Sequence, residues 1–370
     1  MKQILYICSN APVGMLPFAT SIIKAASKSE KLDVHAIVVD RDRPLYQTYL
    51  KDLPEDKIHF LHISKNKFKK SINMLYAIDI LRTVKKINSV HKIDAIHLLT
   101  SDFSCFSIIR QLKKIAFVYY TVHDVNIHEK VYASIKEYLI IKFIRWCVKK
   151  VIRKADALVT NSQLQYIRLK NMYPHKNVCF QLFPSLITSS ILSGEKICPE
   201  ITNLNKYILF FGRLEKYKGV EHLYEAFKNN KNLREFNLVI AGKGYIYFPH
   251  TCDSRVIFMN RYIEDDEIKS LFTKAACVVY PYISATQSGV LSLAYKFQTP
   301  ALVSDIPYFN EISVKKSCLH FKRADVKDLS EKLEQLLFCT NLNEMKVAQK
   351  VFFENGYSEN ALISSTEHLY

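Results

Sequence analysis

Short apolar runs alternate with amphipathic stretches from one end of the chain to the other. Between the apolar runs, Val220, Leu223 and Phe227 have the spacing of one helical face. Regular alternation of strand and helix predicts an α/β architecture with parallel sheets and helices on both faces. The strand-like runs lie at 3–8, 34–39, 58–62, 94–99, 116–121, 156–160, 177–182, 207–211, 236–241, 255–259, 277–280, 300–303 and 318–321.

The alternation weakens between residues 183 and 206, where proline, serine and glycine gather in pairs and triplets. Such stretches are typical of linkers. We therefore predict two doubly wound, Rossmann-like domains whose strand ends face a central cleft, where sheets of this kind bind ligands. The predicted parts are a first domain at 1–185, a linker at 186–206, a second domain at 207–352, and a C-terminal helix within 353–370 that packs back on the first domain.

Composition narrows the classes of partner. The formal net charge of +17 favours anionic partners, either nucleic acid, acidic lipid or phosphorylated substrates, without choosing between them. A generally basic composition of the source organism is the alternative explanation. No helix-turn-helix, zinc-finger or RNA-recognition pattern occurs, and the aromatic residues fall in core strands, so we expect no nucleic-acid partner.

Targeting and redox features point to a cytoplasmic protein. The first residues, MKQILYICSN, have the pattern of a first strand and lack the apolar length of a secretory leader. No apolar run reaches the roughly 18 residues that a membrane span requires. The nine cysteines form no CxxC pair, which predicts free thiols and no zinc site. They are Cys8, Cys105, Cys147, Cys179, Cys198, Cys252, Cys277, Cys318 and Cys339.

The strongest local signal begins at Tyr207, where the sequence reads YILFFGRLEKYKGVEHLYEAF. Gly212 and Arg213 follow a predicted strand, and Lys218 precedes a predicted helix, so both cations are expected at the cleft. Arginine contacts phosphate oxygens in a bidentate manner and lysine adds a point charge. The segment therefore predicts a diphosphate site. The alternative is a solvated turn with ordinary surface charges.

A second segment, VVYPYISATQSGVLSLAYKFQTPALVSD, runs from Val278 to Asp305. A buried strand leads into small polar residues, and an apolar helix starts near Gly289. Free backbone N–H groups at a helix start bind anions, and a glycine there allows a ligand to approach the backbone closely. The alternative is a simple capping turn, because serine at such positions is common.

The order of these motifs resembles the donor domain of glycosyltransferase family 4, over about Tyr207 to Glu311 and more weakly in the N-terminal half. The resemblance implies the GT-B fold, a nucleoside-diphosphate sugar as donor and transfer with retention. The motifs that carry it are Gly212-Arg213, Lys218-Gly219, Ala241-Gly242-Lys243-Gly244, Pro281-Tyr282, Ser288-Gly289-Val290-Leu291 and Thr299-Pro300.

The resemblance also implies roles for single residues. Arg213 and Lys218 are similar to the pair that binds the donor diphosphate. Gly289, Val290 and Leu291 resemble the backbone loop under the distal phosphate. The segment 259–263, with Arg261 and Tyr262, is similar to the one that borders the nucleobase, and Glu311 falls where the family often has a glutamate.

One departure from the family pattern concerns two glutamates, seven residues apart, that usually contact the donor sugar and ribose. The window 284–293 reads SATQSGVLSL and contains no acid. Thr286, Gln287 or Ser288 is then expected to contact the donor. The departure leaves the identity of the donor open.

The N-terminal half offers His123, which with Asp124 ends a β-branched and aromatic run. The family has a histidine near the reacting sugar after this strand, so His123 is the expected catalytic residue; a structural His–Asp pair is the alternative. The family's glycine-rich first loop is replaced by SNAPVG, where Gly14 is the one candidate for a donor contact. Lesser candidates at other strand ends are His97, Asp102, Asn161 and Ser162.

The segment 134–154 predicts a basic amphipathic helix. Its apolar positions Ile135, Leu139, Ile140, Phe143, Ile144, Cys147 and Ile152 alternate with Lys142, Arg145, Lys149, Lys150, Arg153 and Lys154. Helices of this kind lie on anionic membrane surfaces. A core-facing helix with a solvated basic face is the alternative.

These features together predict an enzyme that moves a sugar from a nucleoside-diphosphate sugar to a hydroxyl of a glycan, lipid-linked, in surface polysaccharide or lipopolysaccharide synthesis. Arg213 and Lys218 would neutralise the leaving diphosphate, so neither a metal nor another cofactor is expected. A degenerate GT-B protein that acts as a non-catalytic binding or assembly partner is one alternative. A GT-B epimerase or phosphorylase is another, and an epimerase would need cleft carboxylates that are not evident.

Overall fold

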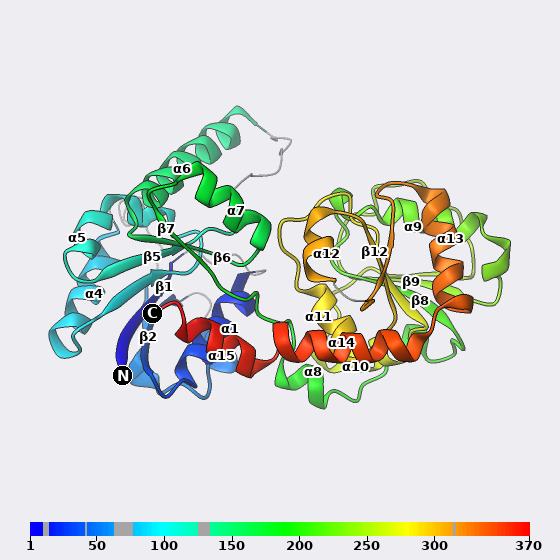
Figure 1. The fold of residues 1–370 in the computed structure, drawn as a ribbon, viewed down its shortest axis with the longest axis horizontal. Coiled ribbons are helices and arrows are strands. Elements are labelled where there is room, and N and C mark those ends of the chain that lie inside the picture. The colour runs from blue at the N-terminus through cyan, green and yellow to red at the C-terminus, as the bar shows by residue number, and fades with distance from the viewer. Residues whose placement is uncertain (10–14, 41–42, 63–76, 125–133, 314–315) are drawn as a thin grey trace. The chain divides into compact units, whose positions relative to one another are not determined.

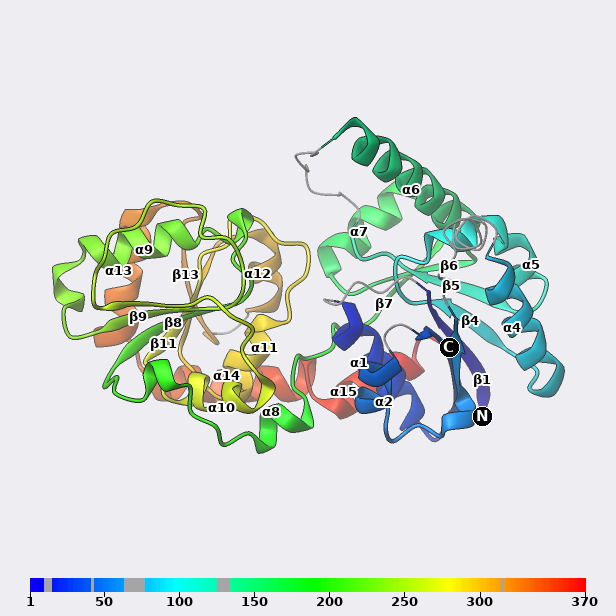
Figure 2. The same ribbon diagram turned by 180° about the vertical axis from the view of Figure 1, so that it is seen from behind.

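The computed structural model describes residues 1–9, 15–40, 43–62, 77–124, 134–313 and 316–370. The chain forms two compact units, which are described separately (Figures 1 and 2). The N-terminal unit combines Met1–Pro184 with Glu359–Tyr370, and the C-terminal unit is Ser185–Ser358. Gly14, a predicted donor contact, lies outside the described residues.

The described part of the N-terminal unit contains a seven-stranded sheet in the order β3-β2-β1-β4-β5-β6-β7. All neighbouring strands are parallel. The order reverses between β1 and β4, which is where ligands bind to sheets of this topology. The strands are β1 (Lys2–Cys8), β2 (Leu32–Val39), β3 (Ile58–Leu61), β4 (Ala95–Leu98), β5 (Phe117–Thr121), β6 (Ala157–Thr160) and β7 (Asn177–Phe180).

Helices cover both faces of this sheet (Figure 1). Successive side chains of β1 enter different cores, since Ile4 and Tyr6 pack on one face and Leu5 and Ile7 on the other. This alternation explains why the parallel strands are continuous apolar runs. The helices are α1 (Leu16–Ser27), α2 (Arg43–Tyr49), α4 (Ile78–Val90), α5 (Ile109–Lys113), α6 (Ile135–Lys154) and α7 (Gln163–Met172).

The last helix of the chain, α15 (Glu359–Glu367), belongs to the N-terminal unit and packs against α1. Leu362 and Leu369 enter the same apolar core as α1. At the surface, Lys28 pairs with Glu359 at 2.6 Å, and Lys31 pairs with Glu367 at 2.6 Å. Of the predicted C-terminal segment 353–370, residues 353–358 belong to the C-terminal unit, and 353–356 are the end of α14 (Leu342–Gly356).

The C-terminal unit repeats the same topology. Its described six-stranded sheet has the order β10-β9-β8-β11-β12-β13, again parallel and reversing beside its first strand. The strands are β8 (Tyr207–Phe211), β9 (Asn237–Ala241), β10 (Val256–Met259), β11 (Cys277–Tyr280), β12 (Ala301–Ser304) and β13 (Leu319–Phe321). The helices that pack around them include α9 (Val220–Asn229), α10 (Asp265–Thr273), α11 (Val290–Lys296), α12 (Pro307–Ile312), α13 (Val326–Glu334) and α14 (Leu342–Gly356).

The segment predicted as a linker, 186–206, packs as part of the C-terminal unit, which begins at Ser185. It contains α8 (Ser189–Ser193) and a 3-10 turn at Pro199–Ile201. Ile191, Cys198 and Ile201 are buried in the core of that unit. These apolar residues are irregularly spaced, so the sequence shows no periodicity there although the segment is packed.

Other expectations concern membranes, metals and thiols. Among the described residues, no helix is long and apolar enough to cross a bilayer, and no cluster of histidine, cysteine or carboxylate residues has metal-binding geometry. All nine cysteines are free thiols, most of them buried.

Candidate functional site

The predicted site lies at the carboxyl ends of β8 and β11, the two neighbours at which the strand order of the C-terminal unit reverses. Gly212 and Arg213 follow β8, and Pro281 and Tyr282 follow β11. Ligands of doubly wound sheets bind at this edge. The fold therefore brings the two sequence motifs together at one place.

Glycines allow the backbone segments at this edge to approach each other closely. Gly219 has a φ of 61°, and a Cβ atom there would lie 2.2 Å from the Pro281 carbonyl oxygen. Gly242 has a φ of +141°, and its Cβ would lie 2.2 Å from the Gly212 carbonyl oxygen. Both conformations disfavour any other residue. Half of the eight glycines of the chain, Gly212, Gly219, Gly242 and Gly244, gather at this edge.

Lys218 ends a 3-10 turn, Lys216–Lys218. The close approach of Gly219 to the Pro281 carbonyl oxygen holds this turn against the end of β11. Its side chain turns back towards β8, since a Cβ atom on Gly212 would lie 2.7 Å from Lys218 Nζ. Lys218 is only 6% exposed. The predicted cation is thus a buried residue and not part of a solvated turn.

The electrostatic environment of Lys218 is unusual for a lysine. Its ammonium group lies 5.1 Å from the centre of the Tyr282 ring and 5.9 Å from that of Tyr217. Among the described residues, no carboxylate forms an ion pair with it. Burial lowers the pKa of Lys218, while Tyr217 and Glu215 act in the opposite direction and Arg213 adds to the lowering. Burial removes the favourable interactions of the ammonium group with water, and a bound anion would replace them.

Arg213 and Tyr282 flank the lysine. The Arg213 side chain is 72% exposed and pairs with Glu215 at 3.0 Å, so its remaining donors face solvent. The Tyr282 ring is buried, and its hydroxyl makes no hydrogen bond of normal geometry with any described residue. Burial raises the pKa of Tyr282, and the Ser288 side chain acts in the opposite direction. The Pro281-Tyr282 motif marks this tyrosine in the sequence but does not show that its hydroxyl lacks a partner, because a tyrosine after a buried strand is common in cores.

The loop before α11 contributes backbone and amide groups. Thr286, Gln287 and Ser288 are half-buried, and the Tyr308 hydroxyl donates to the Ser288 carbonyl at 2.9 Å. The buried amide nitrogen of Gln287 has no hydrogen-bond partner in the described part of the chain. Gly289 caps α11, and the Val290 and Leu291 side chains are buried in the core. Only the backbone of these last two residues is available to a ligand.

The Arg261 side chain is engaged by two carboxylates. Its guanidinium group bonds the Glu200 carboxylate at 2.9 and 3.0 Å and the Glu267 carboxylate at 2.7 and 3.0 Å. It also donates to the Tyr262 carbonyl at 3.1 Å. All five N–H donors are therefore used, and none remains for a nucleobase. Tyr262 itself has a mostly exposed ring.

His123 follows β5 in the N-terminal unit, at the carboxyl edge of the sheet, as predicted. Its Nε2–H group donates to the Leu99 carbonyl at 2.9 Å, and the Phe18 ring packs edge-on at 4.9 Å. Burial lowers the pKa of His123, so the ring is neutral. Nδ1 is then an acceptor, and it has no partner among the described residues. The charge of the neighbouring Asp124 acts against this lowering, so a structural His–Asp pair stays an alternative.

The lesser candidates of the N-terminal unit have structural partners. His97 is buried between the Thr121 hydroxyl, at 2.7 Å, and the Tyr370 hydroxyl, at 2.5 Å, and burial lowers its pKa to about 3. The Asp102 carboxylate accepts hydrogen bonds from Ser9 and Thr100. Asn161 donates to the backbone at Gln181 and Leu182. Glu311, in α12, is half-buried.

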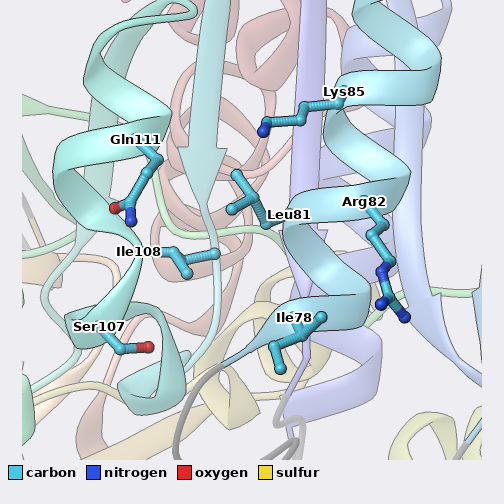
Figure 3. A pocket seen from close by; sticks show the side chains of 7 residues that line it. All are labelled: Ile78, Leu81, Arg82, Lys85, Ser107, Ile108 and Gln111. Atoms are coloured by element: carbon cyan, nitrogen blue, oxygen red, sulfur yellow. The ribbon is translucent and has the colours of Figure 1, made fainter.

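A cavity of about 400 Å³ in the N-terminal unit is separate from these residues (Figure 3). It lies between α4 and the turn that leads into α5. Its lining is apolar with a basic side, and it contains none of the predicted site residues. The lining residues are Ile78, Leu81, Arg82, Lys85, Ser107, Ile108 and Gln111.

A protein-family model matches part of this chain, and the matched part contains the segments that follow β8 and β11. Residues 199–350 match the model of the glycosyl transferases group 1. An uncharacterized glycosyltransferase of Methanocaldococcus jannaschii is 32% identical over 114 residues, which is 29% of this chain and 29% of that protein. The matched part thus spans less than a third of the curated relative. Both matches are to glycosyltransferases, and each covers less than half of this chain.

Solved structures resemble the whole chain. HepE of Anabaena in complex with UDP-glucose is 14% identical, with a TM-score of 0.67 over 100% of this chain and 99% of that chain. Sucrose-phosphate synthase of Thermosynechococcus elongatus is 13% identical, with a TM-score of 0.67 over 100% and 98%. At these identities the likeness concerns the fold. It identifies the fold as GT-B, which confirms the fold predicted from the sequence.

Proposed function

We propose that this protein is a retaining glycosyltransferase of family 4 that moves a sugar from a nucleoside-diphosphate sugar to a hydroxyl of a glycan. The observation that carries the proposal is Lys218, a buried cation without a carboxylate partner in the described residues, at the ligand-binding edge of a doubly wound sheet. A buried charge of this kind is costly unless a ligand pairs with it.

Stabilisation of the leaving group is the main chemical task that we assign to the site. As the bond between the sugar C1 and the diphosphate breaks, negative charge develops on the phosphate oxygen. Lys218 and Arg213 supply positive charge, while the Tyr282 hydroxyl and the backbone N–H groups at the start of α11 supply donors. These groups are fixed before the reaction, so little reorganisation is needed. We propose that the two cations act without a metal.

Retention follows if the acceptor attacks from the face that the diphosphate leaves. The acceptor oxygen then forms the new bond to C1, and its proton passes to the departing phosphate oxygen. No carboxylate of the 284–293 loop is required as a nucleophile. Thr286 and Gln287 are the proposed sugar contacts, and His123 is the proposed contact near the reacting carbon.

The donor and acceptor classes rest on different grounds. HepE, which has the same fold, binds UDP-glucose, so UDP-sugars are the first donors to test. A lipid-linked glycan in surface polysaccharide or lipopolysaccharide synthesis is proposed as the acceptor from the family resemblance. A cytoplasmic location follows from the same proposal.

A metal-free thermal-shift screen of UDP, GDP, ADP and CMP tests the donor site, because a ligand of the native state raises its melting temperature. We expect a shift with one nucleoside diphosphate and its loss in the Arg213→Ala, Lys218→Ala double variant. Transfer should be lost in the same variant. Unchanged transfer there would reject the phosphate assignment.

A non-catalytic binding protein is the second candidate, favoured by the absence of acids in the 284–293 loop. It predicts that nucleotide binding or docking of a partner occurs without turnover. Release of free nucleoside diphosphate from donor sugars, with and without a glycan acceptor, distinguishes the two functions.

A further inference from the structure

The exposed side of α6 carries an unusual density of large apolar side chains. Ile135 is 81% exposed, Leu139 58% and Trp146 46%, although such residues are normally buried. Tyr138, Ile140 and Phe143 are also exposed. The opposite side packs into the N-terminal unit through Cys147, Val151 and Ile152. Figure 1 shows the amino-terminal end of α6 projecting from the sheet of its own unit.

Basic residues lie along the same exposed stripe. Helix α6 contains seven lysines and arginines and a single acid, Glu137. At 100° per residue, Lys142, Lys149 and Arg153 fall within about 60° of the line through Ile135, Leu139 and Trp146. Each of the three cations is exposed, and no ion pair involving them is found in the described residues. The stripe is therefore both apolar and strongly positive.

Aromatic residues organise the middle of this stripe. The Trp146 ring stacks on Phe143 with 5.9 Å between ring centres and meets Phe106 edge-on at 5.6 Å. Lys150 Nζ lies 3.7 Å from the centre of the Trp146 ring. Tryptophan flanked by lysines with long apolar stems is typical of side chains at a membrane–water interface.

We propose that this stripe of α6 docks on an anionic lipid bilayer. The basic side chains would meet lipid phosphates, and the apolar side chains would enter the boundary between headgroups and acyl chains. A nucleic acid satisfies the charges but leaves Ile135 and Leu139 in water. An acidic protein surface would pair with the charges but would bury fewer of the exposed apolar side chains than a bilayer does. The docking surface lies in the N-terminal unit and does not depend on the nucleotide site of the C-terminal unit.

The chain provides its own reporter, because Trp146 is its single tryptophan. With vesicles of phosphatidylglycerol and phosphatidylcholine, we expect the emission of Trp146 to move to shorter wavelength and the protein to sediment with the vesicles. With phosphatidylcholine alone, neither change is expected. Binding should weaken as salt rises, because the charges are screened.

Two variants separate charge from apolar insertion. Lys142, Lys149 and Arg153, all replaced by Glu, should lower vesicle affinity about 100-fold or more, since each cation near the surface contributes roughly a factor of five. Ile135→Ser with Leu139→Ser should reduce the Trp146 shift while leaving the charge unchanged. The matched control replaces Lys51, Lys231 and Lys274, which are exposed elsewhere, by Glu. It should retain binding.

Three outcomes would overturn the proposal. The first is equal binding of the wild-type protein to both kinds of vesicle, and the second is an equal loss of binding in the control. The third is a change in oligomeric state of the α6 variant without any vesicle binding, which would make the stripe a contact between copies. Because the UDP-induced thermal shift reports on the other unit, it should persist in all α6 variants. Its absence in the wild-type protein would count against the proposed function and not against the docking surface.

Discussion

The ammonium group of Lys218 lies 5.1 Å from the centre of the Tyr282 ring and has no carboxylate partner among the described residues. A cation over an aromatic face gains some attraction. This gain does not replace the hydration that the 6%-exposed side chain has lost. The free protein therefore holds a destabilising charge at the place where a diphosphate is expected, and this has measurable consequences.

Lys218→Met should make the free protein more stable and abolish nucleotide binding at once. Methionine keeps the length of the side chain and removes the desolvated charge, so the free energy of unfolding should rise by about 1 kcal/mol or more. Thermal unfolding with and without UDP measures both effects. Lys216→Met is the matched control on the same turn, where the side chain is exposed and little change is expected. A less stable Lys218→Met protein would contradict the assigned electrostatics.

The same charge should produce a pH dependence of defined sign. Burial lowers the pKa of Lys218, so the unfolded chain binds this proton more tightly than the native protein does. Native stability should therefore rise with pH between the lowered pKa and the ordinary lysine value of 10.5. Over the same range, UDP affinity should fall as the ammonium group loses its proton. The difference in unfolding free energy between wild-type protein and Lys218→Met isolates this contribution, and a difference independent of pH would refute it.

Gly219→Ala should destabilise the edge of the sheet that carries Lys218. The substitution places a Cβ atom 2.2 Å from the Pro281 carbonyl oxygen at a φ of 61°, so the backbone must shift. We expect a loss of about 2 kcal/mol or more in urea unfolding, together with weaker nucleotide binding. Gly356→Ala is the control, since its Cβ would make only a 3.4 Å contact with the Phe352 side chain at the end of α14. That variant should be neutral or slightly stabilising.

The strands and helices of the fold could be predicted from the sequence, whereas the distant segments that several residues contact could not. All thirteen predicted strand runs overlap strands of the structure, from Lys2–Cys8 to Leu319–Phe321, because parallel strands buried on both faces are continuous apolar runs. The segment 186–206 was predicted as a linker, although it packs in the C-terminal unit, because its buried residues have no regular spacing. Periodicity indicates which face of an element is buried, but not which distant segment covers it.

Arg261 illustrates the same limit at the level of the site. The motif placed it beside a nucleobase, whereas Glu200, 61 positions away in the sequence, takes part of its hydrogen-bonding capacity. Likewise, the spacing around Lys218 predicted a cation at the cleft without showing that it is buried. The Tyr282 hydroxyl is visible as a candidate only once the strand order brings β11 beside β8.

Arg261→Leu should affect stability and not nucleotide recognition. It leaves the Glu267 carboxylate, whose side chain is 2% exposed, without its main partner. We expect a loss of about 2 kcal/mol or more, measured by urea unfolding, with an unchanged UDP affinity below the new melting temperature. Glu200→Gln should cost less, because Glu200 is 30% exposed. A loss of UDP affinity in fully folded Arg261→Leu protein would restore a binding role.

His123→Ala should separate transfer from donor binding. The neutral ring holds its Nε2–H on the Leu99 carbonyl, which leaves Nδ1 as an acceptor for a sugar hydroxyl. Loss of one such hydrogen bond in the transition state should lower kcat about 10- to 100-fold, while the thermal shift with UDP should stay unchanged because Lys218 and Arg213 remain. Since burial lowers the pKa of His123, activity that depends on neutral Nδ1 should persist below pH 6.5 and fall only as the ring gains its proton. A fall in activity centred at or above the ordinary histidine pKa, or full activity of His123→Ala, would remove this residue from the proposed mechanism.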